Sequence, residues 1–127
     1  MIFLNEKDFR KNISVLVEAI RSNDMKPIII YGENGIGRSR VLRNIGGVIE
    51  ICKYGTPTNT DQAIKEIIIE SLNRGYHRDD SEGRIQYVFS INDQNLFNKI
   101  KKTGIFKCFS MKRTKHQVLD AVTNEPL

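Results

Sequence analysis

The sequence has few of the residues on which small specialised scaffolds depend. Its 127 residues include two cysteines, three prolines and no tryptophan. Cys52 and Cys108 have no CxxC partner, and the two histidines, His77 and His116, lie far from both in sequence. This pattern excludes a disulfide framework and a zinc ribbon. We therefore interpret both cysteines as small buried hydrophobes of a reducing compartment, with metal or thiol chemistry as the alternative.

Long apolar runs are also missing. No apolar stretch approaches the roughly 20 residues that cross a bilayer. Residues 1–6 lack the charged start and the long apolar segment of a signal peptide. We expect an intracellular, cytoplasmic protein without a membrane partner. With 39% hydrophobic and 28% charged residues, residues 1–127 are expected to form a single domain with its own core.

Acidic residues are absent from one stretch of the chain. The whole sequence has 20 Lys and Arg against 15 Asp and Glu, which gives a net charge of +5. Residues 99–115 carry +7 and the remainder carries −2, because seven cations and no acid fall in this stretch: Lys99, Lys101, Lys102, Lys107, Lys112, Arg113 and Lys115. Such a segment suits a polyanion such as nucleic acid, and a role in solubility is the alternative.

The spacing of apolar residues predicts alternating helices and strands. Helices are expected over residues 6–22, with Asn5 as N-cap, and over 39–45, 60–74, 94–102 and 114–123. Strands are expected over 28–31, 48–52, 85–91 and 105–111, and residues 74–83 are interpreted as a polar loop. The alternation predicts a three-layer α/β/α sandwich with a mostly parallel sheet of about four strands. Residues 26–112 are expected to form the central part of this domain.

A glycine-rich segment separates the first of these strands from a helix. Residues 32–39 read Gly-Glu-Asn-Gly-Ile-Gly-Arg-Ser. Glycines let backbone N–H groups turn inward to form a concave anion site, and the following helix adds its positive end. The alternative is a turn without a ligand. The residues expected to contact phosphate are Gly32, Asn34, Gly35, Ile36, Gly37, Arg38, Ser39 and Arg40.

The pattern Gly32-x4-Gly37-Arg38-Ser39 resembles the P-loop (Walker A motif) of nucleotide-binding proteins in all but one position. The resemblance implies a site for ATP and Mg²⁺, with the Ser39 hydroxyl as a Mg²⁺ ligand. The departure is Arg38, where the family has lysine. A guanidinium binds phosphate but occupies a different volume from an ammonium. We expect binding to survive and hydrolysis to be impaired.

A second resemblance lies further along the chain, in Tyr87-Val88-Phe89-Ser90-Ile91-Asn92. This apolar strand ending in asparagine looks like the sensor-one segment of AAA+ ATPases and motif C of the superfamily-three viral replication helicases. The resemblance implies that Asn92 lies beside the P-loop and orients the water that attacks the γ-phosphate. Together the two motifs extend the resemblance over residues 26–122. The alternative is that Asn92 and Asp93 merely cap the next helix.

Two elements of these families are missing or altered. Their Walker B strand ends in an acidic pair, and the only candidate here, residues 48–52, carries a single acid, Glu50, within the strand. Glu50 is nevertheless the best candidate for a catalytic carboxylate. Asp79-Asp80 is interpreted as solvated surface. Lys101-Lys102 stand where AAA+ rings have an arginine finger, so self-contained ring hydrolysis is not expected.

Aromatic residues alternate with the cations of residues 99–115. On a strand, alternate side chains face opposite ways, so we expect some of Phe106, Phe109 and Met111 to pack in the core while Lys107 points outward. Stacking of nucleic-acid bases on the aromatic rings is the alternative.

Three functions stay open on the sequence alone. In the first case the chain is an ATP-binding, AAA+- or helicase-like module that acts in a nucleic-acid transaction such as replication. It then assembles with copies of itself or with a complete ATPase. Alternatively, it is a non-hydrolysing relative that binds nucleotide as a structural or regulatory subunit. In the third case it is a nucleic-acid-binding or interaction domain with a vestigial loop, whose binding falls steeply with salt and ignores ATP.

Overall fold

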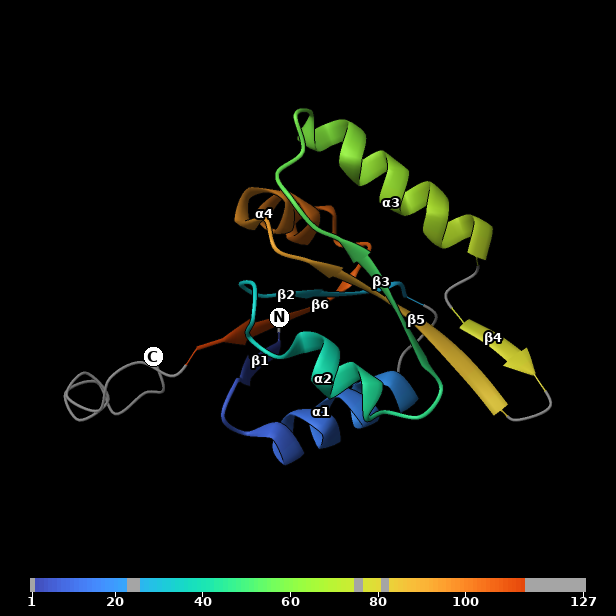
Figure 1. The fold of residues 1–127 in the computed structure, drawn as a ribbon. Helices are drawn as coiled ribbons and strands as arrows, with labels where there is room; N and C mark the ends of the chain where they lie inside the picture. Colours follow the sequence, from blue (N-terminus) through green and yellow to red (C-terminus); the bar gives the residue numbers. More distant parts are fainter. Residues whose placement is uncertain (1, 23–25, 75–76, 81–82, 114–127) are drawn as a thin grey trace, which may run out of the picture.

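The computed structural model describes residues 2–22, 26–74, 77–80 and 83–113, and their strands form a single sheet (Figure 1). Its order is β1–β6–β2–β5–β3, with all five strands parallel, while β4 pairs with β5 in the antiparallel sense. The strands are β1 (Ile2–Asn5), β2 (Ile28–Tyr31), β3 (Val48–Lys53), β4 (His77–Asp80), β5 (Gly83–Ile91) and β6 (Lys107–Lys112).

Helices cover both faces of the sheet. Figure 1 shows α1 (Phe9–Arg21) and α2 (Arg38–Arg43) on one face, and α3 (Thr60–Arg74) and α4 (Gln94–Thr103) on the other. The fold is therefore the α/β/α sandwich that the alternating pattern predicts. Within the described residues, no helix is both long and apolar enough to cross a bilayer.

Two hydrophobic cores lie on opposite faces of the sheet because side chains alternate along each strand. Ile28 and Ile30 of β2 pack in the core beneath α1 and α2. Ile29, between them, packs in the core beneath α3 and α4. All three side chains are fully buried. A central parallel strand is covered on both sides, which explains why β2 is a continuous apolar run.

The chain reverses direction across the sheet at the carboxyl ends of β2 and β5. From β2 it passes through α2 to β3, on the far side of β5; from β5 it passes through α4 to β6, on the far side of β2. These two neighbouring strands therefore lead away in opposite directions. In open parallel sheets the crevice at such a switch point is the usual place for a ligand.

The amino-terminal prediction is wrong in two respects. Ile2–Asn5 forms an unpredicted fifth parallel strand, because it pairs with β6 and places Leu4 opposite Met111, both buried. The first helix begins at Phe9, with Asp8 at its N-cap, and not after Asn5. Asn5 instead accepts a hydrogen bond at its backbone oxygen from the side chain of Asn12 (2.7 Å).

The predicted polar loop at residues 74–83 also needs correction. Residues 77–80, which include Asp79-Asp80, form β4 by pairing with the start of β5. β5 is correspondingly longer than predicted, and β6 begins at Lys107 and not at residue 105. The predicted helix over residues 114–123 lies outside the described residues.

Candidate functional site

The glycine loop, residues 32–37, leaves β2 at the switch point. Gly35 and Gly37 have φ values of 77° and 97°, in the left-handed region that side chains strain. Gly32 is required for a different reason: a Cβ there would lie 2.9 Å from the Ile36 Cγ2 atom. Ile36 is buried and anchors the loop on the core. The loop is therefore a defined curve of backbone. Two of its N–H groups are already engaged, because Gly32 donates to the Ile91 oxygen and Ile36 donates to the Glu33 oxygen (both 3.3 Å).

Asn92 lies beside this loop and joins two segments. Its Nδ2 donates to Asn34 Oδ1 in the glycine loop (2.8 Å), and its Oδ1 accepts from the backbone N–H of Gly55 (2.8 Å). The helix cap is a different residue, because the Asp93 carboxylate accepts from the Leu96 N–H (2.9 Å) at the start of α4. Asn92 therefore does not cap α4, and its hydrogen bonds to Asn34 and Gly55 hold its side chain against the glycine loop.

Arg38, the first residue of α2, is only 4% exposed. Its Nη1 donates to the backbone oxygen of Ile91 at the end of β5 (2.9 Å), and its guanidinium carbon lies 5.1 Å from the centre of the Tyr54 ring. Its Nε is buried without a hydrogen-bond partner. None of the ion pairs among the described residues includes Arg38. A buried cation beside the loop therefore has no carboxylate counterion in this part of the chain.

Ser39 and Glu50 meet on the α2 side of the sheet. Ser39 Oγ donates to Glu50 Oε1 (2.7 Å), and Glu50 Oε2 is buried without a partner. Glu50 pairs with Val88 in the sheet, four residues before Asn92. Four strand residues span about 13 Å. The structure therefore brings Glu50 to Ser39 but places it apart from Asn92.

Tyr31, the last residue of β2, directly precedes the glycine loop. Its ring stacks on Phe97 of α4, with centroids 4.9 Å apart and planes 15° from parallel. Burial raises the pKa of the Tyr31 hydroxyl, and the nearby charges of Glu33 and Asp93 raise it further, while Arg38 acts in the opposite direction. The hydroxyl therefore stays protonated at neutral pH.

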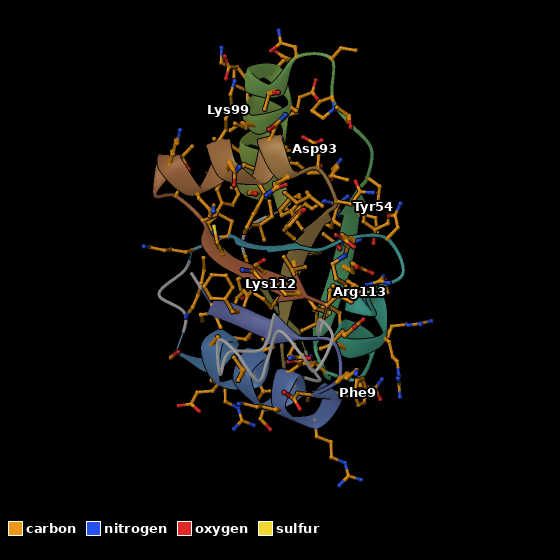
Figure 2. The ribbon with its side chains drawn as sticks, turned by 90° about the vertical axis from the view of Figure 1, so that its left-hand side faces the viewer. Phe9, Tyr54, Asp93, Lys99, Lys112 and Arg113 are labelled. Carbon is orange, nitrogen blue, oxygen red and sulfur yellow. The ribbon has the colours of Figure 1, made fainter. Side chains whose placement is uncertain are left out.

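Three residues of the connection from β3 to α3 complete the site, although the sequence indicated only a turn there. Tyr54 lies over Arg38, and its hydroxyl is 3.4 Å from Ser90 Oγ. Gly55 binds Asn92, and Thr56 Oγ1 donates to Asp93 Oδ1 (3.1 Å). Figure 2, which views the carboxyl ends of the strands, shows Tyr54 and Asp93 on neighbouring segments above the glycine loop. The three hydrogen bonds cross 36 or 37 residues of sequence, so no local pattern reveals them.

The guanidinium of Arg40 lies 4.3 Å from the centre of the Phe9 ring and is directed to α1, so its contact with phosphate stays a prediction. The burial predicted for one cysteine is wrong. Cys52 is exposed, because it lies on the edge strand β3. Cys108 is half-buried, and burial raises the pKa of its thiol.

The cations of residues 99–113 are separated by different partners. Lys107 is directed toward α1 and not simply outward, because its Nζ donates to the backbone oxygen of Ala19 (3.1 Å). Lys99 Nζ lies 3.5 Å from Asp61 Oδ1. Lys101 Nζ lies 5.1 Å from the centre of the Phe97 ring, while Lys102 is exposed.

The carboxyl end of β6 shows the same separation. Lys112 Nζ lies 4.3 Å from the centre of the Phe3 ring. Arg113 Nε lies between carboxylates of Glu6 (3.8 Å) and Glu33 (3.9 Å). Figure 2 shows Lys112 and Arg113 well apart from Lys99 on α4. Lys115 lies outside the described residues.

The apolar residues among these cations pack in the core, as predicted. Phe106 is 7% exposed, Phe109 is fully buried and Met111 is 2% exposed. Their faces are covered by the helices and are not available to stack on bases. The alternative of base stacking on these rings is therefore wrong.

The fold and the site define an α/β protein with a polar, glycine-containing site at the switch point of a parallel sheet. Comparisons with models of known protein families, with curated proteins and with solved structures found no match.

Proposed function

We propose that the chain is a P-loop-like module that binds ATP through the glycine loop without efficient hydrolysis. The observation that carries this proposal is the direct hydrogen bond between Asn92 and Asn34 of the loop. Asn92 and the loop belong to the two motifs on which the resemblance to AAA+ ATPases and superfamily-three helicases rests. They lie 58 residues apart in sequence and adjoin at the switch point.

The charge of Arg38 supports an anionic ligand. A buried cation without a counterion is costly, and an anion at the adjacent loop would offset that cost. Arg38 Nη1 lies 3.2 Å from the place where a Gly32 side chain would begin, so the guanidinium adjoins the first residue of the loop. Its unpartnered Nε is a remaining donor. Phosphates, with several oxygen acceptors, fit this environment.

Mg²⁺ fits the site in part. Ser39 Oγ and the unpartnered Glu50 Oε2 supply oxygen atoms of the kind that Mg²⁺ prefers. Among the described residues, no group of three or more His, Cys, Asp and Glu side chains is arranged to hold a metal ion. Ser39 and Glu50 would hold the ion, which supplies charge neutralisation of the phosphates when bound.

The arrangement of side chains supports impaired hydrolysis. In a P-loop the ammonium of the residue before the serine reaches the β- and γ-phosphates, whereas the Arg38 guanidinium has one donor, Nη1, engaged by the backbone oxygen of Ile91 and keeps Nε for a ligand. For hydrolysis, the general base and the residue that orients the attacking water must also contact the same water molecule. Glu50 pairs with Val88, four residues before Asn92, which corresponds to roughly 13 Å of backbone along the strand direction. We therefore assign ATP binding and not turnover as the function.

A role in a nucleic-acid transaction is a separate part of the proposal. Its support is the exposed carboxyl-terminal turn of α4, where Lys101 and Lys102 lie close together at the surface. In that nucleic-acid transaction the chain would act as a regulatory partner of a complete ATPase or of further copies of itself. Within the part of the chain that the structure describes, Lys107, Lys112 and Arg113 have separate partners and form no continuous second surface for nucleic acid.

Titration with a fluorescent ATP analogue, with and without Mg²⁺, tests the proposal. We expect saturable binding by the wild-type protein, loss of binding in Gly37→Val, and little phosphate release on the same samples. Gly46→Ala is the matched control, because a Cβ at Gly46 meets no atom within 4 Å and its backbone is not left-handed. Absence of binding by a folded wild-type protein would refute the proposal, and rapid phosphate release would refute the loss of hydrolysis.

A further inference from the structure

Two strands flank the glycine loop, because it follows β2 and β2 lies between β5 and β6. On the β5 side, Asn92 binds the loop and Gly55 binds Asn92. On the β6 side, the backbone oxygen of Met111 would lie 3.3 Å from a Cβ at Gly32. A ligand that lies over the loop therefore has two sides along which it can extend.

The β6 side carries a guanidinium between two carboxylates. Arg113, the residue after β6, places its Nε 3.8 Å from Glu6 Oε2 and 3.9 Å from Glu33 Oε2 in the loop. Both distances exceed that of a hydrogen bond. The side chains of Arg113 and Glu33 are 54% and 71% exposed, so a ligand can reach both. In Figure 2, Arg113 lies below Tyr54 and Asp93, which belong to the other side of the loop.

The two sides differ in charge. Arg38, whose Nη1 binds the end of β5, is a buried cation with no ion pair among the described residues. On the β6 side, two carboxylates and one guanidinium leave one net negative charge. Phosphate is attracted to the first environment and repelled by the second, whereas an amino group on a neutral ring donates hydrogen bonds to a carboxylate. These charges orient a nucleotide with its phosphates toward β5.

The shape of a nucleotide leads to the same orientation. Its base and its γ-phosphate are opposite ends of the molecule, and the proposed function has the γ-phosphate beside Asn92, on the β5 side. Neighbouring strands lie about 4.8 Å apart, so the ends of β5 and β6, with β2 between them, are roughly 10 Å apart. The base therefore extends away from Asn92, toward β6.

We propose that the base of the bound nucleotide stacks on the Arg113 guanidinium and that its amino group donates a hydrogen bond to Glu33. The proposal rests on the proposed function and adds to it the place at which the base is recognised. A planar guanidinium stacks on aromatic rings, and every base has such a face. Stacking alone does not distinguish one base from another, so the Glu33 carboxylate supplies the preference for a base with an amino group, as adenine has.

Competition against the fluorescent ATP analogue tests the stacking, with ATP and inorganic triphosphate as competitors. We expect the wild-type protein to prefer ATP roughly tenfold, and Arg113→Ala to lose about threefold to tenfold of this preference. Arg21→Ala is the matched control and should keep it, because Arg21 is exposed at the carboxyl end of α1. Lys107, the first residue of β6, binds that end of α1, so Arg21 lies at the opposite end of the strand from Arg113.

Purine riboside triphosphate, which lacks only the 6-amino group of ATP, tests the hydrogen bond to Glu33. The wild-type protein should bind ATP about threefold to tenfold more tightly than this analogue. Glu33→Ala should bring the two affinities together, because the acceptor is gone. Glu66→Ala, which removes an exposed carboxylate of α3, is the control and should keep the difference. The same difference in wild-type and Glu33→Ala proteins would overturn the role of Glu33.

Nuclear Overhauser effects in the wild-type protein cover the case in which a substitution disturbs the fold. Effects should connect the ring protons of ATP with side-chain protons of Arg113. Effects to residues 54–57 only, or equal affinities of the wild-type protein for ATP and triphosphate, would overturn the base site and leave the phosphate site intact. A loss of preference in Arg21→Ala as large as that in Arg113→Ala would also overturn it. Binding of neither competitor would overturn both proposals.

Discussion

The glycine loop and the basic segment were equally conspicuous in the sequence, but the fold treats them differently. Residues from three distant segments converge at the loop, where Asn92 binds both Asn34 and Gly55. Most cations of residues 99–113 instead diverge to α1, α3 and the β1 side of the sheet, and Arg113 alone among those with a recorded partner lies near the loop, 3.9 Å from the Glu33 carboxylate. Residues that follow the ends of neighbouring parallel strands lie close together, because those ends meet at one edge of the sheet. A run of cations that is recognised only by its composition has no such constraint, and its side chains contact several different elements.

The largest effect is expected from Gly32→Ala, which tests whether the loop is a fixed structure. The added Cβ would lie 2.9 Å from Ile36 Cγ2 and 3.3 Å from the backbone oxygen of Met111. We expect the free energy of unfolding to fall by about 1–3 kcal/mol, as in overpacked cores. ATP binding should be lost with it. Chemical denaturation and ATP titration measure the two effects, and an unchanged Gly32→Ala protein would contradict the description of the loop.

Arg38→Met separates function from stability at the same place. The Ile91 oxygen keeps a second donor, the Gly32 N–H (3.3 Å), so the substitution leaves no orphaned acceptor. Removing a buried charge that has no ion pair among the described residues should leave the free energy of unfolding unchanged or raise it by up to about 2 kcal/mol. ATP affinity should fall roughly tenfold to a hundredfold, because a charged hydrogen bond contributes about 1.5–3 kcal/mol. A destabilised protein with normal affinity would show that Arg38 is structural.

Gly32 and Arg38 also show which parts of the site can be predicted from the sequence. Strand, loop and helix follow from apolar runs and glycine positions, and the meeting of Asn92 with the loop follows from parallel strands ending at one edge. The partners of Arg38 do not follow, because the Tyr54 ring and the Ile91 oxygen reach it through the tertiary fold. β4 escaped prediction for a similar reason: His77–Asp80 has no apolar alternation and becomes a strand by pairing with β5.

A smaller contrast is expected between two lysines of the basic segment. Lys107→Met removes the donor at the carboxyl end of α1 and should lower the free energy of unfolding by about 1 kcal/mol. Lys102→Met, at an exposed position, should leave stability unchanged and reduce the salt dependence of any nucleic-acid binding by about one unit of slope. The same loss of stability in both variants would contradict the separate roles given to them.

The smallest effect concerns Glu70, which lies away from the site. Hydrogen bonds from Lys53 (2.7 Å) and then Arg74 (3.1 Å) hold the pKa of Glu70 below its usual value, against the effect of burial. Its stabilising contribution is therefore present above the ordinary glutamate pKa of about 4.3 and is lost as the pH falls through the lowered value. Glu70→Gln should cost about 0.2–1 kcal/mol at pH 7 and nothing at strongly acidic pH.

Denaturation of wild-type and Glu70→Gln proteins across this range of pH checks the sign. A difference between the two proteins that grows toward acid pH would contradict it. ATP affinity at neutral pH should be the same in both, since Glu70 pairs with Lys53 and Arg74, neither of which belongs to the glycine loop.

The most direct test of the central claim is a titration of isotope-labelled protein with ATP, followed by amide chemical shifts. Shifts concentrated in residues 33–38, at Gly55 and at Asn92 are the predicted result. Shifts confined to residues 99–113, or no shifts at accessible concentrations of ATP, would contradict the assignment of the switch-point loop as the nucleotide site.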